Sequence, residues 1–78
     1  MISMKKLRIN TKGCSYSDFI KLAERSGFVV FEGAKHYKVK TIKGVFITTI
    51  PRKNSLNSFT AKSIAEKLNE FGANIDIY

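Results

Sequence analysis

The most informative part of the chain for its fold is FVVFEGAKHYKVKTIKGVFITTIP, residues 28–51. Runs rich in β-branched and aromatic residues, which are typical of β-strands, cover residues 28–32, 36–42 and 45–50. A turn containing Gly33 follows the first run, and a tight turn around Lys43-Gly44 follows the second. Because proline has no N–H to donate to a sheet, Pro51 ends the third run. The stretch therefore predicts a three-stranded antiparallel meander.

The segments on both sides of the meander have the periodicity of amphipathic helices. In SYSDFIKLAERSGF the apolar residues predict a helix from about residue 16 to 26, with Ser15 and Asp18 spaced as a capping box requires. In FTAKSIAEKLNEF one clean apolar stripe predicts a second helix. The stripe consists of Ala61, Ile64, Ala65, Leu68 and Phe71. The candidate caps are Ser15 or Ser17 for the first helix, and Asn57 or Ser58 for the second.

This order of elements predicts an α+β fold of the type α-β-β-β-α. Each helix has only one apolar stripe, so each must cover a sheet or the other helix. The simplest packing places both helices on one face of the three-stranded antiparallel sheet and leaves the other face open. That is the arrangement of double-stranded-RNA-binding domains, although a fold alone does not assign a function.

The length of 78 residues predicts a single domain, residues 1–78, with a short segment at each end. Residues 1–14 form a basic extension in which the alternation of Leu7 and Ile9 permits a short edge strand. The tail, residues 73–78, either pairs with this extension or is an edge that binds another protein.

The charge of the chain predicts an anionic partner. The net charge is +8 and the sequence pI is about 9.9, which is typical of nucleic-acid-binding domains. Residues 33–65 contain no Asp or Glu but many cations. These cations are Lys35, Lys38, Lys40, Lys43, Arg52, Lys53 and Lys62. Nucleic acid, an acidic protein and an anionic membrane surface would all fit this pattern.

The sequence also argues against several classes of protein, namely disulfide-bonded, metal-binding, secreted and membrane-spanning proteins. Cys14 is the single cysteine and His36 the single histidine, so we expect no internal disulfide, no metal site and no cofactor. The start, MISMKKLRIN, lacks the apolar run of a signal peptide, and no segment approaches the length of a membrane span. We therefore expect a cytoplasmic protein that has no membrane partner.

The histidine lies in a setting that suits RNA cleavage. Side chains alternate along a strand, so His36, Lys38 and Lys40 share one face, which is the open one if Tyr37 and Val39 face the helices. Attack of a ribose 2′-hydroxyl on the adjacent phosphate needs a base and cations, and a neutral imidazole can be that base near pH 7. A basic strand is nevertheless more often a binding face than a reaction centre. On the neighbouring strand Phe46 could stack on a base, but a packing role is favoured for it.

Several short motifs occur in an order that is also found in a known family. The motifs are Asp18-Phe19-Ile20-Lys21-Leu22 before Gly27-Phe28, His36 after a glycine-containing turn, Ile50-Pro51-Arg52 at the end of the third strand, and Thr60 with Ile64 in the second helix. From about Ser15 to Gly72 the chain resembles the HicA-type mRNA interferase toxins of bacterial toxin–antitoxin systems. Ala34-Lys35 stand where the common form has Gly-Ser, and Lys53 stands where many members have a second histidine.

The resemblance implies a small double-stranded-RNA-binding-like fold, metal-independent cleavage of mRNA, and neutralisation by a HicB-type antitoxin. It implies that His36 is the catalytic residue. Our hypothesis gives His36 the role of general base, with Lys35 and Lys38 stabilising the charge on phosphorus. The remaining cations would hold the RNA backbone, and they are Lys40, Lys43, Arg52 and Lys53. The alternatives are a non-catalytic RNA- or DNA-binding module and a protein-interaction subunit with an acidic partner.

Overall fold

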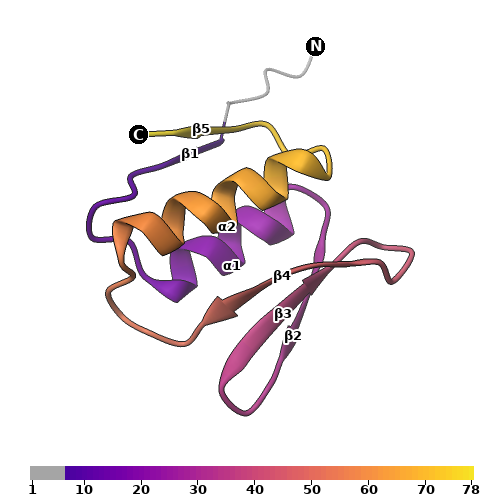
Figure 1. Ribbon diagram of the computed structural model, residues 1–78. Helices are drawn as coiled ribbons and strands as arrows, with labels where there is room; N and C mark the ends of the chain where they lie inside the picture. Colours follow the sequence, from indigo (N-terminus) through magenta and orange to yellow (C-terminus); the bar gives the residue numbers. More distant parts are fainter. Residues whose placement is uncertain (1–6) are drawn as a thin grey trace.

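The computed structural model describes residues 7–78 and arranges them in three layers. A three-stranded sheet, a layer of helices and a two-stranded sheet lie one above another in Figure 1. The elements are β1 (Leu7–Ile9), α1 (Tyr16–Arg25), β2 (Val29–Glu32), β3 (His36–Lys40), β4 (Phe46–Pro51), α2 (Ser58–Glu70) and β5 (Ile75–Ile77). The predicted α-β-β-β-α order is confirmed, and β1 and β5 extend it at its two ends.

The larger sheet is an antiparallel meander in the order β2-β3-β4. Val39 on the central strand pairs with Val30 on β2 and with Thr48 on β4. The next pair along the sheet is Lys40 with Phe46, so a bulge occurs between Val39 and Lys40. A bulge re-aims the side chains that follow it, and this one determines which residues of β4 are buried.

Both helices cover the same face of this sheet (Figure 1), as the single apolar stripes predict. Phe19 of α1, Leu68 of α2 and the sheet residues Val39 and Ile50 are fully buried in one apolar cluster. Burial of one such side chain stabilises the fold by roughly 1.5–3 kcal/mol. The apolar face shared by helices and sheet is therefore the main source of stability, and the opposite face of the sheet is left to solvent.

The helix caps correspond to residues anticipated from the sequence. At α1 the Asp18 carboxylate accepts a hydrogen bond from the Ser15 backbone N–H at 2.9 Å, which is one half of a capping box. At α2 the Asn57 side chain accepts from the Phe59 N–H at 2.8 Å. The sequence left Asn57 and Ser58 open as caps, and Asn57 is the one used.

The two ends of the described chain pair with each other. Strands β1 and β5 are parallel, with Leu7 opposite Ile75 and Ile9 opposite Ile77. Beyond the strands, the Thr11 N–H donates to the Tyr78 carbonyl at 2.7 Å. This pairing confirms one of the two alternatives for the tail, and it gives part of the predicted basic extension a structural role. Residues 1–6 of that extension lie outside the described residues.

Candidate nucleic-acid interface

The register of the meander places the histidine on the face that the helices leave open. Val39 is fully buried and Tyr37 is half-buried, so these residues face the helices. By alternation, His36, Lys38 and Lys40 of the same strand point to the opposite face. His36 is exposed, and within residues 7–78 its imidazole makes no side-chain hydrogen bond. The ring is therefore accessible to a substrate.

A narrow turn between β2 and β3 fixes the start of the histidine strand. The Gly33 N–H donates to the His36 carbonyl at 2.9 Å, which closes the turn through Ala34 and Lys35. A Cβ atom on residue 33 would lie only 2.6 Å from that carbonyl oxygen, closer than real Cβ atoms approach an oxygen. The turn therefore requires glycine at position 33, although Ala34-Lys35 occupy its tip.

Arg52 anchors this turn from the helix-facing side of the sheet. Its Nη2 atom donates to the Glu32 carboxylate at 3.0 Å and to the Gly33 carbonyl at 2.7 Å. The guanidinium also lies over the Tyr37 ring, 4.9 Å from its centroid. Glu32 and Tyr37 are paired neighbours on β2 and β3, so Arg52 joins the strands on both sides of the turn. These contacts place its charge behind the turn and away from the open face.

A shallow groove of about 270 Å³ borders His36. It runs along the free edge of β4 to the first turns of α2, since β4 is the outermost strand on that side. Its lining consists of His36, Thr48, Thr49, Pro51, Phe59, Thr60, Ser63 and Ile64. Several of these side chains are hydroxyls, which can donate hydrogen bonds to phosphate oxygens. These hydroxyls come from β4 and α2, which are remote from His36 in the chain, so the alternation along β3 does not predict them.

The remaining predicted cations are spread over the sheet and its ends. Lys38 and Lys40 share the face of His36, and Lys35 is exposed at the turn directly before it. Lys43 lies at the opposite end of β3, and the strand rise of about 3.3 Å per residue separates even Lys40 from His36 by about 13 Å. The Lys53 carbonyl accepts from the Tyr16 N–H at 3.0 Å, so its backbone is held on the helix side.

Two phenylalanines on the open face complete the surface. Phe31 pairs with Lys38 and Phe46 pairs with Lys40, so both follow the alternation of the lysines. Their side chains are 50% and 51% exposed, respectively. The packing role favoured for Phe46 is thus wrong, because the bulge turns Ile47 into the core and Phe46 outward. We call the surface formed by Phe31, His36, Lys38, Lys40, Phe46 and Thr49 the open-face patch.

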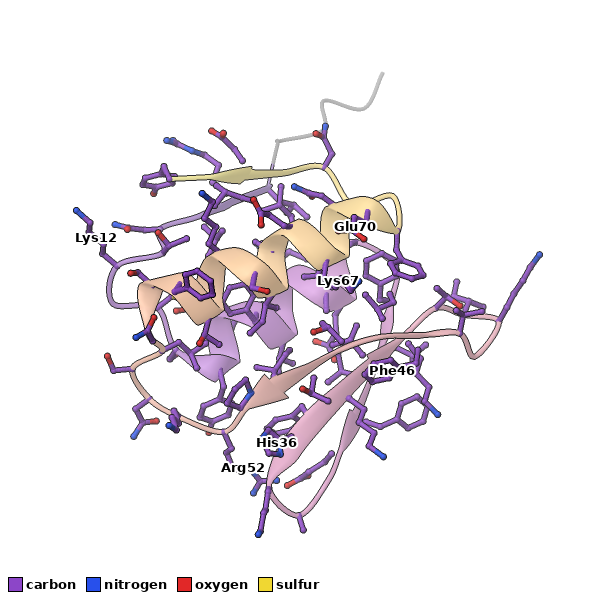
Figure 2. The ribbon with its side chains drawn as sticks, viewed as in Figure 1. Lys12, His36, Phe46, Arg52, Lys67 and Glu70 are labelled. Atoms are coloured by element: carbon purple, nitrogen blue, oxygen red, sulfur yellow. The ribbon has the colours of Figure 1, made fainter. Side chains whose placement is uncertain are left out.

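A second basic hollow, of about 410 Å³, lies between β1 and α1. It is lined by Arg8, Lys12, Lys21 and Arg25 together with the carboxylate of Asp18. Arg8 is partly neutralised by Asp76 at 3.6 Å. Figure 2 shows Lys12 beside β1 and His36 on the three-stranded sheet, with the helices between them, and the hollow shares no lining residue with the groove at His36.

Other chemistry is sparse in the described part of the chain. Within residues 7–78, no three His, Cys, Asp or Glu side chains gather as metal ligands, and no helix is long and apolar enough to cross a membrane. Cys14 is buried, and burial is the main cause that raises the pKa of its thiol above the ordinary value of 9.0. The neutral thiol is a poor nucleophile at neutral pH, which favours a packing role for Cys14.

No family model, no curated protein and no solved structure matches this chain.

Proposed function

We propose that this protein is a HicA-like endoribonuclease, a metal-independent mRNA interferase of the cytoplasm. The observation that carries the proposal is the position of His36. Its imidazole is exposed at the junction of a lysine-bearing sheet face and a groove lined with hydroxyls. General-base catalysis of RNA cleavage needs these components and no cofactor.

The reaction follows from the chemistry of the groups present. Neutral His36 takes the proton of a ribose 2′-hydroxyl while the 2′-oxygen attacks the adjacent phosphorus. The bond from phosphorus to the 5′-oxygen breaks, and the leaving oxygen takes a proton from the imidazolium or from water. The products are a 2′,3′-cyclic phosphate and a 5′-hydroxyl end. A positioned base of this kind contributes about 10²- to 10⁴-fold in rate.

The cations around His36 would have three roles: stabilising charge on phosphorus, contacting the RNA backbone and positioning the turn. Lys35 lies in the turn directly before His36 and Lys38 shares its strand face, so these two lysines would stabilise charge on the phosphorane. Lys40 lies further along the strand and would contact the RNA backbone, as would Lys43 and Lys53 at the ends of the sheet. Arg52 is engaged by Glu32 and Gly33, so we assign it the role of positioning the turn.

A second function on the same surface is a non-catalytic RNA-binding module. The observation that favours it is the lining of the groove, in which His36 is the only titratable side chain. No other group of that lining can supply a proton to the leaving oxygen. This module would bind RNA in a salt-dependent way, because phosphate contacts release counterions. It would leave the RNA intact.

The test compares wild-type protein with His36→Ala on a defined single-stranded RNA, and on the same RNA with one 2′-deoxy substitution at the cleavage position. We expect wild type to cleave the all-ribose RNA only, in EDTA as well as without it, and His36→Ala to bind without cleaving. Lys67→Gln is the matched control, because Lys67 lies on α2 and is paired with Glu70 at 3.6 Å (Figure 2). Circular dichroism establishes that each variant is folded. Binding without cleavage by wild type would leave the binding module, and equal cleavage by His36→Ala would remove the catalytic role.

The proposal includes a HicB-type antitoxin as the protein partner. An acidic protein that covered the open-face patch would block His36 and neutralise the excess positive charge of the chain. Co-expression with an acidic protein encoded alongside should suppress cleavage and yield a stable complex. Tight association with such a protein and no measurable RNA affinity in its absence would instead indicate a protein-interaction subunit.

A further inference from the structure

The aromatic side chains of the open-face patch are not required for the cleavage chemistry. Phe31 and Phe46 are half exposed on a sheet face, although each could have been buried beneath the helices by a shift in register. Large apolar side chains at such positions commonly mark a binding surface when they cluster with polar groups. Here they alternate with lysines on neighbouring strands, so the surface combines apolar rings with positive charge.

The register fixes how the two rings are spaced. Phe31 is level with Lys38 on one side of β3, and Phe46 is level with Lys40 on the other side. With a strand separation of about 4.8 Å and a rise of about 3.3 Å per residue, their Cα atoms lie about 12 Å apart along a diagonal. This separation is too large for both rings to contact one base. The rings are therefore suited to different nucleotides of one strand.

One contact already shows that the face of the Phe31 ring is open to a cation. The Lys40 ammonium lies over this ring, 5.3 Å from its centroid. A cation in that position is held by the electron-rich face of the ring. A nucleobase that stacked on Phe31 would displace the ammonium, which could then pair with the phosphate of the same nucleotide.

We propose that the open-face patch binds single-stranded RNA by stacking bases on Phe31 and Phe46, and that it discriminates against duplex RNA. The proposal extends the proposed function, since it identifies the class of RNA presented to His36. Bases in a duplex are stacked on each other and cannot offer their faces to a protein ring, whereas unpaired bases can. Lys38 and Lys40, between the two rings, would contact the phosphates of the same strand.

The test measures binding rather than cleavage, so that its outcome is independent of catalysis. The probes are a short unstructured RNA and a hairpin duplex of the same composition, both carrying 2′-O-methyl groups that prevent cleavage. We expect wild type to prefer the single strand. Phe31→Leu and Phe46→Leu should each weaken that binding about 5-fold or more, the lower end of the range for loss of a base–aromatic stack. Phe31→Tyr, which keeps the aromatic face, should retain the affinity.

Two controls separate stacking from charge and from folding. Phe71→Leu replaces a partly exposed phenylalanine at the C-terminus of α2, outside the patch, and should leave affinity unchanged. The salt dependence should not change in the Phe→Leu variants, whereas Lys38→Gln should reduce its slope by about 0.7, the value for one phosphate contact of a single strand.

The outcomes are distinct. Equal affinity for duplex and single strand, or wild-type affinity in both Phe→Leu variants, would overturn the stacking proposal. Strong single-strand binding by a protein that cleaves no RNA would overturn only the proposed nuclease function. Absence of binding to either probe would overturn both.

Discussion

Substitution of Arg52 distinguishes a role in RNA binding from a role in holding the turn before His36. In the sequence Arg52 is one of several cations expected to hold the RNA backbone. In the structure it is bound to the Glu32 carboxylate and the Gly33 carbonyl, and it covers the Tyr37 ring. Arg52→Ala removes all these contacts at once, so it should loosen the turn that precedes His36.

The size of the effect can be worked from the contacts. An exposed ion pair contributes about 0.2–1 kcal/mol, and the Arg52 and Glu32 side chains are 37% and 67% exposed. The hydrogen bond to the Gly33 carbonyl adds about 0.5–1.5 kcal/mol, and an exposed cation–π contact adds about 0.5–1 kcal/mol. Because the site is wet and the contacts share one side chain, we expect a loss of about 1–2 kcal/mol in the free energy of unfolding. For a domain of this length that corresponds to a fall in Tm of roughly 4–16 °C.

The assay combines urea unfolding, followed by circular dichroism, with RNA cleavage and RNA binding. A double-mutant cycle with Glu32→Ala should give a coupling of about 0.2–1 kcal/mol between Glu32 and Arg52. Lys53→Ala is the matched control, since Lys53 is the adjacent exposed cation, and it should change stability by less than about 0.5 kcal/mol. Cleavage by Arg52→Ala should fall while RNA affinity and its salt dependence stay close to wild type.

One result would refute this reasoning. If Arg52→Ala were as stable as wild type, showed no coupling to Glu32 and reduced the salt dependence of RNA binding, then Arg52 would be a phosphate contact. The expectation from the sequence would then hold, and the contacts behind the turn would be incidental.

Three further predictions concern the turn, the core and the buried thiol. Gly33→Ala should destabilise the protein by about 1–3 kcal/mol and abolish cleavage, because its Cβ would meet the His36 carbonyl oxygen at 2.6 Å; unchanged thermal unfolding and activity would contradict the turn geometry. Ile50→Ala should cost about 2–5 kcal/mol in urea unfolding, since Ile50 is fully buried, whereas Ile42→Ala, at an 80% exposed position in the turn after β3, should stay within about 0.5 kcal/mol; similar losses would contradict the placement of Ile50 in the core. The folded state raises the pKa of the Cys14 thiol, so its contribution to stability is fully present below the ordinary value of 9.0 and is lost as the pH rises through the folded-state value. The free energy of unfolding should therefore fall less steeply with rising alkaline pH in Cys14→Ala than in wild type. Native protein should also react with iodoacetamide more slowly than a free thiol does; equal rates would show that Cys14 is accessible.

Local sequence patterns predict most of the fold. Period-two alternation in HYKVK and the apolar stripe of the second helix were enough to predict the meander, the helices and the shared face that they bury. The same alternation predicts that His36, Lys38 and Lys40 share a face, because one strand determines that arrangement by itself. The RNA-binding and catalytic roles of these residues remain predictions.

The features that the sequence did not predict depend on contacts between strands. FVVF, residues 28–31, is a continuous apolar run, so its period does not say which face Phe31 occupies; only pairing with Lys38 decides that. Phe46 was misjudged because a bulge, which alternation cannot reveal, lies next to it. The parallel direction of the β1–β5 pair and the grouping of hydroxyls in the groove both depend on residues that are distant in the chain, so local patterns do not predict them. A possible signal for the groove was Phe59, which lies off the apolar stripe of α2 and is 82% exposed.

The pairing of β1 with β5 has a consequence for the order in which the molecule is assembled during synthesis. The Thr11 hydroxyl and the Tyr78 carbonyl that accepts its hydrogen bond are 67 residues apart, so β1 lacks this pairing until β5 has left the ribosome. The meander with His36 is made earlier and relies on local pairings, which form more readily than distant ones. The β1–β5 pair therefore forms late, on the side of the helices away from the three-stranded sheet. We expect its amides to exchange with deuterium sooner than those of the central strand β3.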